Sequence, residues 1–268
     1  MNTPLLNKKF ADIGARMKVA KPSRWWLRSN GPISLDIASD RRGEFFEITS
    51  DPDADLEVEV LDVQPTDRHL LLLVREEGEK SKYLCGHDER HWFVAGIPES
   101  APVGTVPQAK QALQPARVQT AVSRKKLGKK DRYRRKNEAY LRQGEWFFLP
   151  VENLQVDERC VLRNEPLQRG FRSKPHKVDF CYRIGGETVY VCGMQPNGVT
   201  EGEYRKILEK NPKANKWGWR VMRRNPGVFV RGRVRHADHA TIKLKGWHRV
   251  VMNTEDQSQA MRNVAFLD

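Results

Sequence analysis

The stretch YLCGHDERHW, residues 83–92, places Cys85, His87 and His91 within seven positions. Thiolate and neutral imidazole are among the side chains that bind zinc in proteins, and a structural site arranges four such ligands in a tetrahedron. These three residues are therefore a candidate zinc site that lacks one ligand. If the fold brings one of them near, the fourth could be His236, His239 or Cys192.

The same stretch has a simpler interpretation as a polar turn. Asp88 and Glu89 would form the turn, and the apolar run that begins at Phe93 would continue as a buried strand. A Cys/His trio without paired spacing is a weak metal signal. The sequence therefore favours the turn and keeps zinc as the alternative.

A second group of candidate residues lies near the end of the chain. Asp238 and His239 are adjacent, Asn253 follows fourteen residues after His239, and Asn263 follows ten residues later. The pattern around them predicts a strand, a turn, a strand and a short helix. Over residues 236–264 this arrangement resembles the ββα-metal core of HNH-type nucleases in their His-Asn-Asn form.

The resemblance implies that Asp238 and Asn263 hold one divalent cation, that His239 activates water, and that Asn253 orients His239. Such a cation polarises the scissile phosphate while a neutral imidazole accepts a proton from water. The sequence departs from the family at LKGWHR, which reads as a tight hairpin where the family has an irregular loop. Without the resemblance, Asp238 and His239 form a polar turn and Asn253 caps a helix or ends a strand.

Other constellations carry less chemistry. Four carboxylates lie across the first predicted hairpin and could bind Mg²⁺: Asp36, Asp40, Glu44 and Glu47. Acidic hairpin edges are more often solvated or paired with nearby arginines, here Arg41 and Arg42. The chain has no P-loop, dinucleotide fingerprint or GxSxG elbow, so ATP hydrolysis, nicotinamide chemistry and serine hydrolysis have no support.

The segment RKKLGKKDRYRRK, residues 124–136, concentrates positive charge in the middle of the chain. It contains one acidic residue, Asp131, and nine cations: Arg124, Lys125, Lys126, Lys129, Lys130, Arg132, Arg134, Arg135 and Lys136. Such a run is a solvated helix or tether, or it is an arm that binds phosphates and releases their counterions.

Aromatic residues alternate with cations further along, in KWGWRVMRR, residues 216–224. Trp217 and Trp219 lie close to Arg220, Arg223 and Arg224. An exposed aromatic ring stacks on a nucleic-acid base while a neighbouring arginine holds the backbone. Buried, the two tryptophans would instead belong to the core.

The charge of the whole chain is uneven. The net charge is +14, but residues 1–116 carry −3, residues 117–142 carry +9 and residues 143–268 carry +8. An acidic first part joined to a basic remainder predicts a polyanionic partner for the remainder.

Length and cysteine usage limit the class of protein. A chain of 268 residues can bury a substantial core without covalent staples. Its four cysteines show no CxxC pair, and no run of 18 apolar residues occurs. We therefore expect a reduced, cytoplasmic protein with no membrane contact.

The elements that position these residues are mainly strands. Alternating or continuous apolar runs predict strands over 33–37, 45–49, 56–63, 69–74, 82–86, 91–98, 145–151, 160–162, 177–184, 187–193, 217–224, 227–236, 240–244 and 247–253. Gly185-Gly186 and Lys245-Gly246 are predicted hairpin turns. Helices are predicted around 107–113, after the capping box Thr200–Glu203, and after Thr254.

This pattern predicts a mainly β or α+β fold. We expect an acidic β-meander module at 1–100, resembling a small barrel or sandwich, a linker with a basic arm at 101–142, and a basic β-rich module with short helices at 143–268. The arm is expected to be helical or flexible.

The function that the sequence favours is intracellular nucleic-acid binding, with RNA slightly preferred over DNA. The arm and the Arg/Trp strand would contact phosphates and bases, the N-terminal module would bind protein partners, and the whole would be a subunit of a larger nucleoprotein complex. The alternative is a metal-dependent nuclease or RNA-processing enzyme centred on His239, with GHDERH as the other wall of its site. No cofactor is required by the first interpretation, whereas the alternatives would use Mg²⁺ or Zn²⁺.

Overall fold

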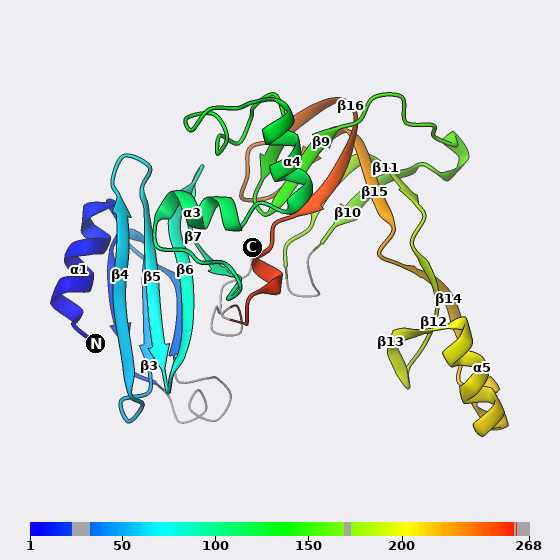
Figure 1. Ribbon diagram of the computed structural model, residues 1–268, viewed down its shortest axis with the longest axis horizontal. Coiled ribbons are helices and arrows are strands. Elements are labelled where there is room, and N and C mark those ends of the chain that lie inside the picture. Colours follow the sequence, from blue (N-terminus) through cyan, green and yellow to red (C-terminus); the bar gives the residue numbers. More distant parts are fainter. Residues whose placement is uncertain (23–32, 169–172, 260, 262–268) are drawn as a thin grey trace.

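A computed structural model of the chain describes residues 1–22, 33–168, 173–259 and 261. In this part of the chain the strands form four separate sheets, and none of the four closes into a barrel. Figure 1 shows the first two sheets at one end of the molecule, a larger sheet in the middle and a small projecting sheet at the other end. The predicted β-rich α+β class is confirmed.

Two sheets build the N-terminal part. Its elements are α1 (Thr3–Asp12), β1 (Met17–Ala20), β2 (Ile33–Asp40), β3 (Gly43–Ser50), β4 (Leu56–Gln64), β5 (His69–Glu76), β6 (Glu79–Asp88) and β7 (His91–Ile97). The first sheet has the order β1-β3-β2, and the second is the meander β4-β5-β6-β7. Helix α1 and the parallel pairing of β1 with β3 were not predicted, because residues 1–30 show no clear apolar period.

The two sheets enclose one core. Its largest fully buried side chains include Phe10 of α1, Phe46 of β3 and Tyr83 of β6. The continuous apolar run of β5 is explained by burial on both faces, since Leu70 and Leu72 enter this core while Leu71 packs into a second cluster on the other side.

One short helix, α3 (Val106–Ala112), lies over that other side. The next helix, α4 (Ala116–Arg124), packs elsewhere, where its Val118 and Val122 join a separate cluster with Tyr140 and Phe147. A capping box between Thr105 and Gln108 begins α3, and its Val106 and Ala109 bury against β5, β6 and β7. The helix predicted at 107–113 is therefore present.

A six-stranded antiparallel sheet forms the central part, in the order β10-β11-β15-β16-β9-β8. Its strands are β8 (Leu141–Gln143), β9 (Trp146–Pro150), β10 (Leu162–Leu167), β11 (His176–Ile184), β15 (Gly227–Arg235) and β16 (Ile242–Met252). A 3₁₀ turn, η1 (Glu158–Cys160), precedes β10, and Phe148, Val178 and Val230 are fully buried in the core of this sheet.

The hairpin predicted at Lys245-Gly246 is wrong, because the chain there forms the single strand β16. Two strands joined by a turn at Lys245-Gly246 were expected, but residues 242–252 form one strand that pairs with β15 on one side and β9 on the other. Pairing with β15 resumes on both sides of Gly246, at Leu244 and at His248, so the chain continues as one strand through the glycine. After β16 the chain forms only the 3₁₀ turn η3 (Glu255–Gln257) where a helix was predicted.

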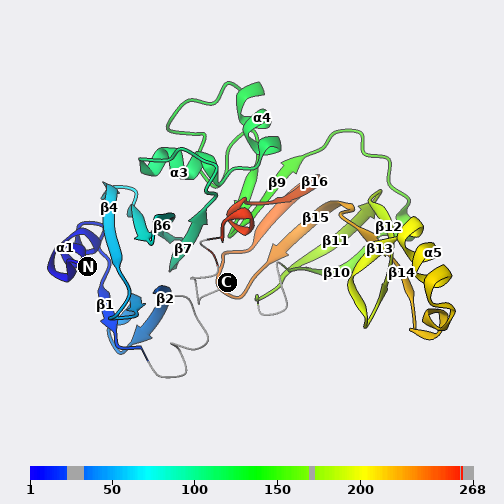
Figure 2. The same cartoon turned by 60° about the horizontal axis from the view of Figure 1, so that its bottom comes forward.

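The chain between β11 and β15 forms a projecting unit (Figures 1 and 2). From here on we call this unit, residues 185–226, the arm, and the basic arm predicted from the sequence is called the basic segment 124–136. It contains β12 (Glu187–Cys192), β13 (Gln195–Thr200), α5 (Glu201–Lys210), η2 (Pro212–Lys216) and β14 (Arg220–Arg224). The predicted capping box is present, with Thr200 and Glu203 at the start of α5.

Gly185-Gly186 joins the arm to the sheet, and the hairpin predicted there is wrong. Strand β11 pairs with β15, whereas β12 pairs with β14, so the two glycines lie within a ribbon that passes from one sheet to the next. Both have positive φ, and a Cβ on Gly186 would lie 2.6 Å from the backbone oxygen of Arg224. Close backbone approach therefore requires glycine at this position.

The division of the chain into modules that end at residues 100 and 142 stays a prediction. Residues of the first and the last module are in direct contact. The backbone N–H of Ala240 donates to Glu89 Oε2 at 2.7 Å, so the last part of the chain is joined directly to the first.

Candidate functional site

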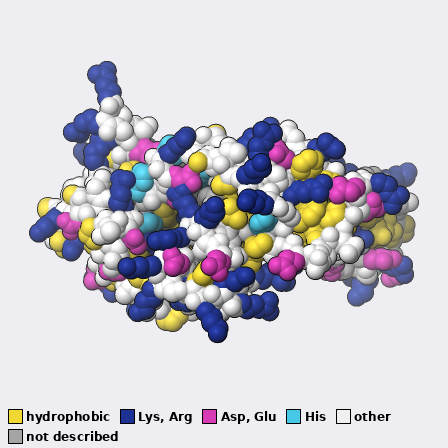
Figure 3. All heavy atoms as spheres, turned by 90° about the horizontal axis from the view of Figure 1, so that it is seen from above, with side chains coloured by type: hydrophobic (Ala, Val, Ile, Leu, Met, Phe, Trp, Pro, Cys, Tyr) yellow, Lys and Arg dark blue, Asp and Glu magenta, His cyan; other side chains and the backbone are white. Residues whose placement is uncertain are grey.

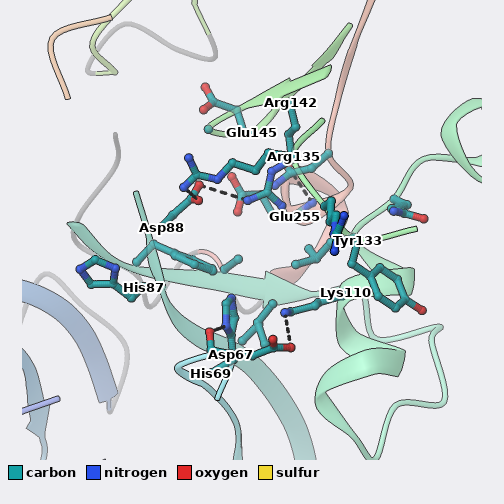
Figure 4. A pocket seen from close by; sticks show the side chains of 18 of the residues that line it. Asp67, His69, His87, Asp88, Lys110, Tyr133, Arg135, Arg142, Glu145 and Glu255 are labelled. Atoms are coloured by element: carbon teal, nitrogen blue, oxygen red, sulfur yellow. Dashed lines mark hydrogen bonds and ion pairs between the residues drawn. The ribbon is translucent and has the colours of Figure 1, made fainter. Parts of the chain in front are cut away.

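A cavity of about 750 Å³ lies where the N-terminal meander, the basic segment 124–136 and the central sheet meet. The polar side chains that line it include those of Asp67, His69, His87, Asp88, Lys110, Lys129, Lys130, Tyr133, Arg134, Arg135, Arg142, His239 and Asn253. Figure 4 shows part of this lining, with Asp88 directed toward Arg135 and Arg142, and Lys110 toward Asp67. The cavity therefore collects charged groups from three separate regions of the chain.

Asp88 is the centre of the charge network in this cavity. Arg142 Nη2 donates to its Oδ2 at 3.1 Å, and Arg135 donates to its other oxygen. Burial raises the pKa of the Asp88 carboxyl, but the charges of Arg142 and Arg135 outweigh burial and the net pKa is lowered. The carboxylate is therefore held in its ionised form.

The turn of GHDERH extends this network. Glu89 is paired with Arg135 and accepts the Ala240 backbone hydrogen bond, one residue after His239. Residues 89–90 connect β6 to β7, so the interpretation of GHDERHW as a polar turn before a buried strand is confirmed. The structure also brings this turn beside the His239 loop.

Three histidines form a compact cluster, and one of them, His239, also lines the cavity. His176 begins β11, His236 follows β15 and His239 lies in the loop before β16. One ligand nitrogen from each can be chosen so that all three lie within 4.8 Å of one another. The rings are stacked, with centroids 4.1 Å apart for His176 and His236 and 4.8 Å apart for His236 and His239.

The cluster is buried and short of hydrogen bonds. His176 is 0% exposed and His239 is 6% exposed. Burial lowers the pKa of His176 to about 3, with the charges of His236 and His239 acting in the same direction. Burial and His236 lower the pKa of His239 to about 4, so both imidazoles are neutral at neutral pH.

The zinc trio predicted from GHDERHW is not assembled. Cys85 is fully buried in the N-terminal core, where burial strongly raises the pKa of its thiol. His87 packs edge-on against Trp92, and His91 Nδ1 lies 2.5 Å from Glu44 Oε1. Among the described residues, only His176, His236 and His239 form a group of three or more His, Cys, Asp or Glu side chains whose ligand atoms lie close enough together to hold one ion.

The residues of the HNH resemblance are only partly brought together. His239 and Asn253 line the same cavity, whereas Asp238 pairs with Lys174 at 2.6 Å. Asn253 Oδ1 accepts from the backbone N–H of Glu255 at 3.4 Å, at the start of η3. Asn263 lies outside the described residues, and the two strands of the expected ββα motif form the single strand β16.

Two of the four acidic residues of the first hairpin, Asp40 and Glu44, have partners in the protein. Asp40 pairs with Arg16 and Lys18, and these contacts hold its pKa well below the usual range. Glu44 accepts from the backbone N–H of Trp92 at 2.9 Å as well as contacting His91. The structure gives these side chains protein partners in place of a common cation.

The basic segment 124–136 is anchored to the body at its second half. Arg132 is half-buried, and its backbone oxygen accepts from Tyr140 Oη at 2.7 Å and from Gln114 Nε2 at 3.0 Å. Arg134 pairs with Asp131, and Arg135 is bound to Asp88 and Glu89. The segment is therefore a folded loop after α4 with an exposed cationic first half.

Eight of the predicted nucleic-acid-binding cations are exposed and have no carboxylate within ion-pair distance among the described residues. They are Arg124, Lys125, Lys126, Lys129, Lys130, Lys136, Arg220 and Arg223. Arg224 is paired with Glu187 at 2.8 Å. Figure 3 shows Lys and Arg side chains spread along the whole face seen from above, with Asp and Glu side chains scattered among them.

The two predicted base-stacking residues lie at the surface of the arm and are both half-buried. Trp217 and Trp219 have ring centroids 5.9 Å apart, and Trp219 also packs edge-on against Tyr204. Trp219 Nε1 donates to the backbone oxygen of Ala214 at 2.8 Å, whereas no hydrogen bond of the Trp217 indole is seen among the described residues. Trp217 is thus the more available of the two rings.

His176 is the residue that sequence reasoning missed. It stands alone in RSKPHK, away from the two histidine-rich segments. Antiparallel pairing of Lys177 with Arg235 places its neighbour His176 beside His236. The two strands were predicted, but their pairing is a long-range property that the local pattern does not specify.

Comparisons with known proteins give no match to any protein-family model, curated protein or solved structure. Within the part of the chain that the structure describes, no helix combines the length and the apolar character that crossing a membrane requires.

Proposed function

We propose that this protein binds nucleic acid through the exposed cations of residues 124–130 and of the arm. The observation that carries the proposal is the set of exposed Lys and Arg side chains without carboxylate partners, five of which lie between Arg124 and Lys130. Elsewhere on the surface many arginines are paired, including Arg183 with Glu165 and Arg233 with Asp179. Unpaired cations can neutralise phosphates and release their counterions.

The arm supplies the second contact. It carries eight basic and four acidic residues, and its exposed side includes Trp217, Arg220 and Arg223. A half-buried ring beside exposed guanidinium groups fits single-stranded nucleic acid, whose bases can stack on any aromatic face. Single-stranded nucleic acid is therefore the preferred kind of partner, and within it we place RNA ahead of DNA. In this proposal the N-terminal sheets contact other proteins of a nucleoprotein complex.

The test replaces four cations of the first half of the segment. Lys125, Lys126, Lys129 and Lys130 are changed together to glutamine, and binding of a labelled single-stranded RNA, a single-stranded DNA and a DNA duplex is followed by fluorescence anisotropy. All four are exposed, so the fold should be kept. We expect affinity to fall for every sequence, and the log–log salt slope to become shallower by about 0.7 for each lost contact on a single strand.

A matched control has the same charge change in the N-terminal part. Lys8, Lys9, Arg41 and Lys80 are changed together to glutamine, a set that lies on or beside α1, β2 and β6. If the control variant loses as much affinity as the first, the protein attracts polyanions through net charge alone and the proposed surface is wrong.

A second candidate function is metal-dependent cleavage of nucleic acid at the cavity. It is favoured by the position of His239, which lines a cavity with Lys129, Lys130 and Arg142 and belongs to a buried histidine cluster. Labelled RNA and DNA are incubated with and without Mg²⁺, Mn²⁺ or Zn²⁺. Cleavage that is lost in His239→Ala supports this candidate, and intact substrate under every condition removes it.

A further inference from the structure

The histidine cluster contains buried nitrogen atoms that the protein itself does not satisfy. Among the described side chains, Nδ1 and Nε2 of His176, Nε2 of His236 and Nε2 of His239 have no hydrogen-bond partner. A buried polar atom without a partner destabilises the folded protein. Four such atoms in one cluster indicate that something else contacts them.

Two of these atoms face a common space beside a glycine. A Cβ built on Gly144 would lie 2.9 Å from His239 Nε2 and 3.3 Å from His176 Nε2. Any side chain at residue 144 would therefore occupy the region in front of two unsatisfied nitrogens. Gly144, with φ +56°, leaves that region open.

Contacts from neighbouring residues hold the loop that carries two of the histidines. Gln143 Nε2 donates to the backbone oxygen of Ala240 at 2.7 Å and lies 3.4 Å from that of Val234. Glu89 binds the Ala240 backbone from the other side. The chain from Val234 to Ala240 is thus fixed at both ends, and His236 and His239 are presented from a braced loop.

His236 is oriented by its own neighbours. Its Nδ1 accepts from the backbone N–H of Asp238 at 3.2 Å, and burial lowers its pKa while the Asp238 charge and a backbone hydrogen bond with Lys174 act in the other direction. A neutral ring that accepts at Nδ1 carries its proton on Nε2, so zinc binding through Nε2 requires the ring to give up the Asp238 contact and move that proton to Nδ1.

We infer that His176, His236 and His239 bind one Zn²⁺ ion. Three imidazoles suit zinc, and three protein ligands leave a fourth position for water or substrate. Tetrahedral coordination with Zn–N bonds of about 2.0–2.1 Å separates the nitrogens by about 3.3 Å. The present separations, up to 4.8 Å, require the stacked rings to turn and approach when the ion binds.

The fourth position is on the side of the cavity. Gly144 and His239 both line that cavity, next to Arg142 and Glu145. A zinc-bound water there would be reached from the same space that Lys129 and Lys130 border. The metal site does not depend on the proposed nucleic-acid binding, because its ligands are separate from the exposed cations.

The competing explanation is a stack of neutral histidines that only fills space. Near-parallel rings 4.1 Å and 4.8 Å apart pack well without a metal. This explanation predicts no stoichiometric metal, and it leaves all four nitrogens unsatisfied, whereas one zinc ion would engage three of them.

The test measures metal on the full-length protein without a polyhistidine tag. The protein is dialysed with Zn²⁺, freed of loose metal and analysed for zinc, and Co²⁺ is titrated as a spectroscopic substitute. We expect one zinc per chain and the visible absorption of tetrahedral Co²⁺. His176→Gln, His236→Gln and His239→Gln should each weaken binding by at least about tenfold.

Two further variants make the result specific. The double variant His87→Gln/His91→Gln changes the histidines of GHDERHW, which do not belong to the cluster, and should retain the zinc. His239→Cys keeps a zinc ligand and should add thiolate-to-Co²⁺ charge-transfer absorption, which a structural role would not produce. Absence of stoichiometric metal from the wild type, or zinc lost only in the double variant, would overturn the inference.

Discussion

At Asp88, burial and two guanidinium groups act in opposite directions on one carboxylate. The side chain is 15% exposed, and it joins Arg142 of β8 to Arg135 of the basic segment. Its neighbour Glu89 links the same segment to the His239 loop. One turn of the N-terminal meander therefore determines where the other two walls of the cavity lie.

Asp88→Asn should destabilise the protein at neutral pH, because it leaves the partly buried guanidinium group of Arg142 without its carboxylate and leaves Arg135 with Glu89 alone. Removing one member of a fully buried pair costs about 3–5 kcal/mol, and partial exposure of these arginines reduces the expected loss to about 1–3 kcal/mol. Since the folded pKa of Asp88 is lowered, its contribution is present above the unfolded pKa of about 3.9 and is lost as pH falls through the lower folded value.

Urea unfolding of Asp88→Asn and wild type at pH 7 measures this loss. Asp55→Asn, at an exposed position without an ion pair among the described residues, is the control and should change stability by less than about 0.5 kcal/mol. Equal stability of Asp88→Asn and wild type at pH 7 would show that the network does not hold the walls together.

His69 also makes stability depend on pH, but here the cause is burial of an imidazole and not the pairing of a carboxylate. Burial lowers its pKa to about 4, and the charges of Lys110 and Arg142 act in the same direction against Asp67. An unfolded histidine has a pKa of about 6.5, so between pH 6.5 and 4 the unfolded chain binds the proton first and stability falls as pH falls. His69→Gln should remove up to about 1.4 kcal/mol per pH unit from that slope. The free energy of unfolding of wild type and of His69→Gln is measured from pH 4 to 6.5. Parallel curves of this free energy against pH would show that His69 does not cause the dependence.

At the scale of elements, the arm is the part whose shape suggests contact with a partner. The four rings of Tyr190, Tyr204, Trp219 and Trp217 follow one another, beginning with a stacked pair 4.2 Å apart. Exposed apolar side chains lie on the same unit, including Met194 and Val221 at 67% and 66% exposure. Trp217 is the end of the aromatic row.

Trp217→Ala should weaken binding of single-stranded RNA by roughly five- to 150-fold, the equivalent of about 1–3 kcal/mol for one stacked base. Duplex DNA, whose bases are already stacked, should be affected much less. Trp219→Ala is the contrast, because its indole anchors η2 through Ala214 and its loss should lower the stability of the arm. Equal affinity of Trp217→Ala and wild type for the single strand would remove base stacking from the account.

The strands of this protein were largely predictable, and their pairing was not. Alternation marked β2 to β7 and the capping box marked α5, because those signals depend on neighbouring residues. The turns predicted at Gly185-Gly186 and Lys245-Gly246 were wrong because the local sequence does not distinguish a hairpin turn from glycines that lie between two sheets or within one continuous strand. His176 was missed for the same reason, since only the pairing of β11 with β15 brings it to His236.

At the scale of the whole molecule, the sequence fixes how charge is distributed along the chain and the fold decides which charges remain available. Net charges of −3, +9 and +8 follow one another along the chain. In the structure, carboxylates neutralise Arg134, Arg135 and Arg224, so the predicted surface becomes smaller, while Lys125 to Lys130 stay open. The account therefore depends on a subset of the cations and predicts a definite number of phosphate contacts.

The most direct test is the salt dependence of wild-type binding to a single-stranded RNA. If about five of the exposed cations contact phosphates, the slope of log K against log salt concentration should be roughly −3 to −4. Affinity that is absent at low salt, or a slope shallower than about −1, would contradict the claim that these side chains bind a phosphate backbone.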